Sequence, residues 1–138
     1  MIALPRVIDA GVLIKLHLDE VDSDAAIRAV RGKRELAAPD LLWAETGNIL
    51  WKYVRRGELQ AAEAERLLAD MMQMPIRTIP TAEIIESALT IAMETGRTVY
   101  DCIYVAAAVA VGGVVLTADR RLVNALAGHP DGAFVRGL

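Results

Sequence analysis

The sequence has a single cysteine and no excess of positive charge. Cys102 stands alone, so an intrachain disulfide is excluded, and this residue is most simply a small buried apolar side chain. The 138 residues include 15 basic and 18 acidic side chains, which gives a formal net charge of −3. This balance argues against a generally basic coat for nucleic acid, but it leaves room for a local basic patch.

Long apolar runs are also missing. The longest, residues 103–116, is interrupted by Gly112-Gly113 and is too short to span a bilayer. No basic-then-apolar signal segment opens the chain, because Arg6 precedes only a short apolar stretch. We therefore expect a cytoplasmic protein without a membrane segment.

The motifs of several common phosphate-handling proteins are absent. A Walker-type nucleotide site needs a glycine-rich loop that ends in Lys-Ser/Thr, and the one Gly-Gly pair, 112–113, has no such lysine. A haloacid-dehalogenase-type phosphatase needs a second aspartate at position 11, which is Gly11 here. A receiver-type phospho-acceptor domain needs paired acids after its first strand and a lysine after its last, and the chain has neither.

Short apolar strands alternate with helices along what we expect to be one domain, residues 1–138. Strands are predicted at residues 6–9, 36–38, 76–79 and 114–117, with a last edge strand at 133–135. Helices are predicted at residues 12–18, 25–31, 41–56, 58–73, 81–95 and 101–111, and from 120 onward. This alternation predicts an α/β fold whose mainly parallel sheet is covered by helices on both faces.

Acidic residues stand where an α/β sheet places its ligand site, beyond the carboxyl ends of the strands. Asp9 ends the first strand, Asp119 follows the strand 114–117, and Asp101 opens the helix before that strand. Two of these acids also fit structural roles. Residues 98–101 match a variant capping box, and Asp119 is suited to cap the helix that begins at Arg120.

Glu45 lies inside a predicted helix, too far from its start to serve as a cap. Three of its four nearest helical neighbours are apolar, so its carboxylate belongs to a stripe that faces the core; they are Leu41, Leu42, Asn48 and Ile49. A buried glutamate is costly unless it is paired, hydrogen-bonded or bound to a metal ion. Partial exposure, with the side chain reaching the helix edge, is the alternative.

Four carboxylates can converge at one end of the sheet if the strands are parallel neighbours: Asp9, Glu45, Asp101 and Asp119. We refer to them as the four acids. Four such groups cannot all stay ionised close together without a cation. Oxygen ligands without histidine or cysteine favour Mg²⁺ or Mn²⁺ over zinc, and we interpret His17 and His129 as surface or structural residues. Such an ion suits phosphodiester hydrolysis, because it activates water and stabilises charge on the phosphate.

Four segments carry a resemblance to a known family: Val-Ile-Asp-Ala at 7–10, Pro-Asp-Leu-Leu-Trp-Ala-Glu at 39–45, Thr-Val-Tyr-Asp at 98–101 and Leu-Thr-Ala-Asp-Arg-Arg-Leu at 116–122. Their order and spacing resemble the PIN-domain family, most closely the small PIN ribonucleases of VapBC-type toxin–antitoxin pairs. The resemblance implies a three-layer α/β/α fold, and it identifies the four acids as the catalytic and metal-binding quartet. Thr117 matches the small polar residue that precedes the last acid.

For function, the resemblance implies a Mg²⁺- or Mn²⁺-dependent endoribonuclease that acts on RNA, forms a homodimer and is inhibited by a small cognate antitoxin. One departure stands out. The family commonly has Ser, Thr or Asn two positions after its first aspartate, and Gly11 occupies that position. The alternative is therefore a PIN-like binding or scaffold module with a weak or inactive metal site.

Two further sets of residues bear on partners and substrate. Mean hydropathy of +0.35 is high for a domain with 24% charged residues, which predicts an exposed apolar surface for a partner. We expect it near the helix after Gly57, whose apolar residues are Leu67, Leu68, Met71 and Met72, with Met74 beyond. Phosphate contacts are expected among Lys15, Lys52, Arg55, Arg56, Arg120 and Arg121, any of which is equally suited to a solvated surface.

Overall fold

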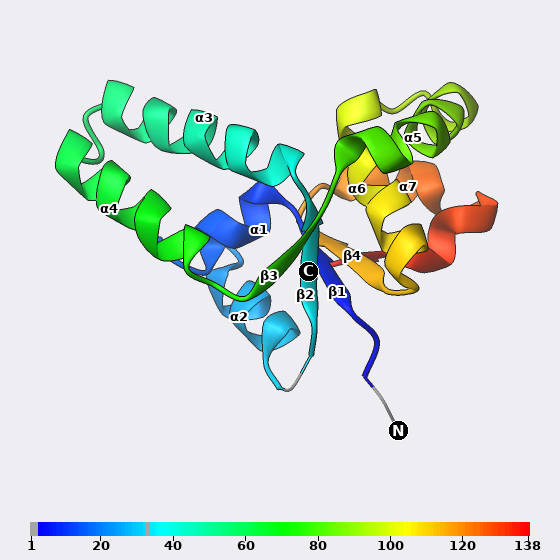
Figure 1. Ribbon diagram of the computed structural model, residues 1–138, viewed down its shortest axis with the longest axis horizontal. Helices are drawn as coiled ribbons and strands as arrows, with labels where there is room; N and C mark the ends of the chain where they lie inside the picture. Colours follow the sequence, from blue (N-terminus) through cyan, green and yellow to red (C-terminus); the bar gives the residue numbers. More distant parts are fainter. Residues whose placement is uncertain (1–2, 33) are drawn as a thin grey trace.

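A computed structural model describes residues 3–32 and 34–138 (Figure 1). At its centre lies a five-stranded sheet in which every pair of neighbouring strands is parallel. In spatial order the strands are β3 (Ile76–Ile79), β2 (Leu36–Pro39), β1 (Arg6–Ile8), β4 (Val114–Thr117) and β5 (Val135–Gly137). The register aligns Val7 of β1 with Ala37 of β2 on one side and with Val115 of β4 on the other. The predicted parallel α/β sheet is confirmed.

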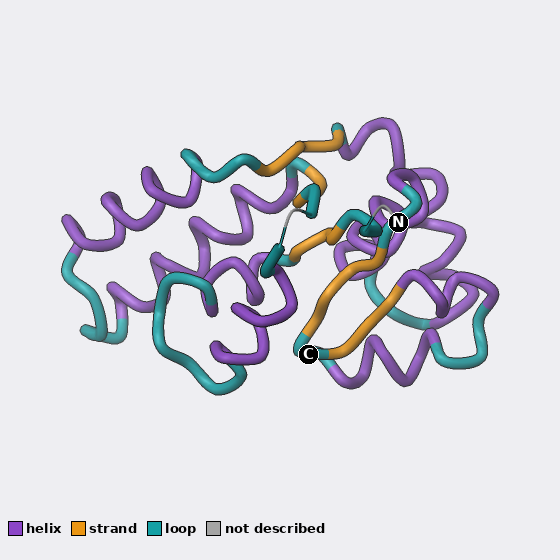
Figure 2. Tube along the Cα trace, turned by 90° about the horizontal axis from the view of Figure 1, so that it is seen from below, coloured by secondary structure: helices purple, strands orange, loops and turns teal. Residues whose placement is uncertain are grey.

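Two groups of helices flank the strands. On one side are α1 (Ala10–Lys15), α2 (Ser23–Val30), α3 (Leu41–Arg55) and α4 (Ala61–Met72), and on the other are α5 (Thr81–Thr95), α6 (Val99–Val111) and α7 (Arg120–Leu126). Figure 2 shows the strands running between the two groups. No helix in residues 3–32 or 34–138 is long and apolar enough to cross a bilayer.

The connections reverse direction between β1 and β4. From β1 the chain moves outward to β2 and then β3, whereas β4 leads the other way to β5. The segments that leave β1 and β4 therefore diverge to opposite sides of the sheet, and a crevice forms at their carboxyl ends. Both of these strands are fully buried, which fixes the walls of the crevice on a rigid part of the fold.

The helix α6 holds the two halves of the core together. It contacts β1, β2 and β4 and also packs along α5. Seven consecutive residues, Cys102 to Ala108, are buried, so this helix is apolar around most of its circumference. It ends at Val111, and the φ of 66° at the following Gly112 suits glycine. The chain then passes so close to Pro5 that a side chain on Gly113 would overlap its carbonyl oxygen.

The helical hairpin of α3 and α4 extends away from the sheet on the left of Figure 1. Its apolar content is less exposed than the sequence suggests. Met71 is fully buried and belongs to the core, whereas Met72 is 54% exposed. The expectation of a methionine-rich surface here is therefore wrong for Met71, because its side chain lies on the face of α4 that packs inward.

The last strand begins at a later residue than predicted. A 3₁₀ helix, η1 (Pro130–Phe134), covers residues expected to form the last strand, and β5 starts only at Val135. Pro130 stands at the first position of η1, and the His129 ring accepts a hydrogen bond from the amide of Asp131. These local hydrogen bonds fix the turn, so the edge strand exists but begins two residues later.

Candidate active site

Asp9 lies at the point where β1 ends and α1 begins. One carboxylate oxygen accepts a hydrogen bond of 2.7 Å from the amide of Val12, so the residue caps α1. Loss of surrounding water, with a smaller contribution from the nearby charge of Glu45, raises the pKa of this half-buried carboxyl to about 6. Hydrogen bonds from the Val12 amide and the Thr117 hydroxyl oppose the rise. A carboxylate in this environment is stabilised by a proton or by a nearby cation.

Glu45 projects from α3 toward α6 and is held there by a buried phenol. The Tyr104 hydroxyl donates a 2.6 Å hydrogen bond to Oε1 of Glu45, and Tyr104 is only 4% exposed. Burial first, and then the bond to Glu45, raise the pKa of the tyrosine, so it stays a donor. The half-buried glutamate does not reach freely into solvent, because this bond fixes its orientation. Tyr104 was not predicted, although it follows Asp101 by three residues on the same face of α6.

Asp101 and Asp119 share one arginine. Nη2 of Arg97 donates to Oδ2 of Asp101 at 3.0 Å and lies 3.4 Å from Oδ2 of Asp119. Arg97 precedes α6 and is 24% exposed at its side chain, so it is part of the site rather than a free surface charge. Arg97 was not among the predicted site residues. Its position four residues before Asp101 was the available signal.

The structural roles proposed for the last two acids are present alongside their place in the site. Thr98 caps α6 by accepting from the amide of Asp101, and Asp119 caps α7 by accepting from the amides of Arg121 and Leu122. Capping fixes the backbone at both positions. It therefore orients the carboxylates of Asp101 and Asp119 without removing them from the pocket.

All four acids line one pocket of about 270 Å³ at the carboxyl ends of β1 and β4. The other lining residues are Ala10, Gly11, Asn48, Ile49, Lys52, Tyr104, Val115, Thr117 and Leu122. Thr117 is buried, and its hydroxyl accepts from the amide of Asp119 at 3.0 Å. The pocket thus coincides with the crevice created where the strand order reverses.

The donor set of this pocket fits Mg²⁺ or Mn²⁺ by ligand type, since every acidic ligand offers oxygen. Within the residues that the structure describes, however, no three acidic, histidine or cysteine side chains are close enough together to form a ready metal cage. Arg97 already supplies positive charge to two of the acids, and Tyr104 occupies Glu45. Arg97 therefore offsets part of the negative charge of the site, while Asp9 and Glu45 still repel each other.

Gly11 leaves space next to the first acid. A Cβ at this position would lie 3.4 Å from Oδ1 of Asp9, which is ordinary contact, and the backbone there needs no unusual conformation. A serine at position 11 would therefore fit beside Asp9. The glycine removes a polar group from the site without altering the fold.

The two histidines have structural contacts outside this pocket, as the sequence predicted. The His17 ring forms a hydrogen bond with the carbonyl of Leu13, and His129 bonds to Glu94 on one side and to the amide of Asp131 in η1 on the other.

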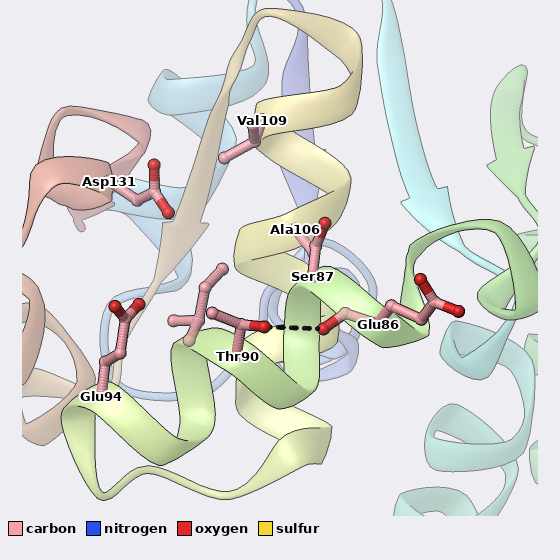
Figure 3. Close-up of a pocket in the computed structure, with 8 residues that line it drawn as sticks. Glu86, Ser87, Thr90, Glu94, Ala106, Val109 and Asp131 are labelled. Carbon is pink, nitrogen blue, oxygen red and sulfur yellow. Dashed lines mark hydrogen bonds between the residues drawn. The ribbon is translucent and has the colours of Figure 1, made fainter.

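A larger hollow of about 370 Å³ lies near His129, between α5, α6 and η1 (Figure 3). It contains acidic side chains from α5, where Thr90 donates to the carbonyl of Glu86, but none of the four acids.

An acid-lined pocket at the reversal point of a parallel α/β sheet lies where folds of this class bind their ligands. Residues 6–127 match the model of the PIN domain family, and this chain belongs to that family. It is 39% identical over 118 residues to Ribonuclease VapC3 from Pyrobaculum aerophilum, covering 84% of this chain and 90% of the relative.

Solved structures agree with the fold. The crystal structure of PAE2754 from Pyrobaculum aerophilum gives a TM-score of 0.68 at 30% identity, with 88% of this chain and 79% of that chain covered. A toxin–antitoxin complex from Klebsiella pneumoniae gives 0.63 at 16% identity, with 95% of each chain covered. At that identity the second likeness concerns the fold alone.

Proposed function

We propose that this protein is a Mg²⁺- or Mn²⁺-dependent endoribonuclease that acts in the cytoplasm as the toxin of a toxin–antitoxin pair. The observation that carries this proposal is the convergence of the four acids in one pocket of a PIN-domain chain. Its relative at 39% identity is named as a ribonuclease, which supports RNA as the substrate.

Within the pocket, Asp9, Glu45, Asp101 and Asp119 would hold the ion. When bound, such an ion activates water and offsets the negative charge of the phosphodiester. The chain's own residues prepare the site. Tyr104 orients Glu45, the helix caps orient Asp101 and Asp119, and the Lys52 ammonium at the pocket wall is suited to attract a phosphate.

The test is cleavage of labelled single-stranded RNA by the purified protein. We expect internal cuts when Mg²⁺ or Mn²⁺ is present and none when EDTA is in excess, because the acids repel the phosphodiester unless a cation neutralises them. Gel analysis of the fragments separates internal cuts from stepwise shortening of the strand ends. Full activity in excess EDTA would contradict the proposal.

The alternative is a PIN-like binding module with a weak or inactive site. Gly11 favours it, because the pocket lacks a hydroxyl or amide at that position. Calorimetric titration with Mn²⁺ distinguishes the two functions before any RNA is added. Binding that is lost when one of the four acids is replaced supports the enzyme, whereas no detectable binding supports the module.

We also propose that the chain forms a homodimer and binds a small antitoxin whose apolar helix or extended tail lies along α4. A hollow of about 290 Å³ runs there between α4 and Leu18, with Leu59 and Leu67 as further apolar walls. Glu63, Arg66 and Asp70 stand around it and offer charged contacts to a peptide. An arginine at the end of such a tail would form ion pairs with the four acids, as Arg97 does with Asp101 and Asp119.

Two measurements test these contacts. Light scattering at micromolar concentration should give twice the chain mass, and a strict monomer would count against the dimer. For the antitoxin, we expect Leu67→Glu to weaken capture of the cognate small protein, since it places a charge in the hollow. Ala69→Glu adds the same charge to an exposed residue on the opposite side of α4 and should have little effect. Equal capture by both variants would exclude this surface.

A further inference from the structure

The helix α3 continues beyond the pocket as an exposed face with an uncommon composition. Asn48 and Lys52 line the pocket, and helical spacing places Trp51 and Arg55 beside them, farther from the four acids. Trp51 is 53% exposed, although a large aromatic side chain of this kind is usually well covered. Because α3 rises ~1.5 Å per residue, Trp51 and Arg55 lie about 9 and 15 Å along the helix from Glu45.

Positive charge accompanies this exposed ring. The guanidinium carbon of Arg55 lies 5.3 Å from the centroid of the Trp51 ring, within the range of a cation–π contact. Among residues 3–32 and 34–138, neither Lys52 nor Arg55 forms an ion pair. By contrast, Arg56 is paired with Glu58, so its charge is already balanced.

An exposed indole beside cations without partners is suited to single-stranded nucleic acid. An unpaired base stacks on an aromatic ring, while lysine and arginine contact the neighbouring phosphates. Base pairs inside a duplex cannot offer a free face to the ring, so the arrangement favours single strands. The same residues reach the pocket through Asn48 and Lys52, so one strand can contact both.

We propose that Asn48, Trp51, Lys52 and Arg55 form a track for single-stranded RNA that leads from the pocket of the four acids along α3. One unpaired base stacks on Trp51, and Lys52 and Arg55 contact the phosphates on either side of it. This inference rests on the proposed function, because it takes RNA as the substrate, and it names the part of the chain that holds the strand.

Fluorescence of Trp51 tests the track without requiring cleavage. The chain has two tryptophans, so Trp43→Phe leaves Trp51 as the one reporter. The probe is a short 2′-O-methyl RNA oligonucleotide, which keeps the bases and phosphates that the track would contact. We expect the single strand to quench the indole emission and the matching duplex to have little effect. Equal quenching by the duplex would overturn the single-strand assignment.

Affinity for the same probe separates stacking from charge. Trp51→Ala should weaken binding roughly tenfold, whereas Trp51→Phe should retain most of it, because a base stacks on either ring. Lys52→Ala with Arg55→Ala should weaken binding and reduce the slope of log affinity against log salt, by about 0.7 for each lost phosphate contact. Arg28→Ala removes an exposed cation from α2, at the other end of the sheet, and should change neither quantity.

Three results would overturn the track, and they distinguish it from the proposed function. If the protein cleaves RNA in a metal-dependent way but Trp51→Ala binds the probe normally, the track is wrong and the ribonuclease stands. If the wild-type protein neither cleaves RNA nor binds the probe, both fall. If Trp51 emission shifts with protein concentration in the absence of RNA, a second copy of the chain covers this face instead.

Discussion

Asp9→Asn is expected to lower the rate of RNA cleavage by at least about a hundredfold while leaving the fold intact. The change removes one negative charge from the group that would hold the divalent ion, and electrostatic groups of this kind commonly contribute 10²–10³ in rate. The cap of α1 survives, since the amide oxygen of asparagine still accepts from Val12. Asp101→Asn should have a similar effect, because its carboxylate lies in the same pocket.

Initial rates with saturating Mn²⁺ give the measurement, and circular dichroism verifies that each variant is folded. Asp24→Asn removes the same charge from an exposed position on α2 and should retain the wild-type rate. Calorimetry on the variants adds a second readout, because weaker Mn²⁺ binding is expected for Asp9→Asn and Asp101→Asn alone. Undiminished cleavage by both variants would remove the four acids from the mechanism.

Much of the fold could be predicted because its signals are local. The buried strands β1 and β4 are short apolar runs, and Gly57, Gly96 and Gly112 follow the ends of their helices. Asp9 and Asp119 were predicted to share one site because ligands bind beyond the carboxyl ends of parallel strands. This prediction assumed that the two strands are parallel neighbours. That assumption is confirmed by the pairing of β1 with β4.

The contacts that complete the site could not be predicted in the same way. Tyr104 and Glu45 are 59 positions apart, and Arg97 and Asp119 are 22 apart. Each pairing depends on how two elements pack, which no local pattern specifies. The sequence predicted four carboxylates that need a cation, and the spacing of Arg97 and Asp101 indicated only one of the two ion pairs that this arginine forms.

The surface of the helical hairpin shows a different limit. Neighbouring methionines on a helix point in different directions, so Met71 is fully buried while Met72 is exposed. The composition predicted exposed apolar residues near this hairpin, and the structure has such residues on other helices too. Exposed apolar side chains on α5 form a stripe at helical spacing: Ile85, Leu89 and Met93. The exposed apolar surface therefore lies on α5 as well as on the hairpin.

Without a divalent ion, Asp9→Asn should also stabilise the protein at neutral and alkaline pH. Burial raises the pKa of Asp9 from an ordinary 3.8 to about 6, so the folded chain holds this proton more tightly than the unfolded chain. Below about pH 4 the carboxyl is protonated in both states, and its ionisation costs nothing. Between about pH 4 and 6 the unfolded chain ionises first, so stability falls as pH rises. Above about pH 6 the full penalty remains.

The free-energy cost of ionising Asp9 in the folded chain follows from the rise in its pKa. A difference of about 2 pKa units corresponds to about 3 kcal/mol at ~1.4 kcal/mol per unit, an upper value for a half-buried group that water still reaches. Urea unfolding in EDTA should therefore show Asp9→Asn to be more stable than the wild type by up to about 3 kcal/mol at pH 8, with the difference vanishing near pH 4. Asp24→Asn is the matched control for loss of one charge.

Saturating Mn²⁺ at pH 8 should make the wild type more stable than Asp9→Asn, because an ion that binds only the folded wild-type site adds its binding free energy to stability. A variant that is less stable than the wild type at pH 8 in EDTA would show that the Asp9 carboxylate is held by contacts stronger than the repulsion and desolvation that raise its pKa.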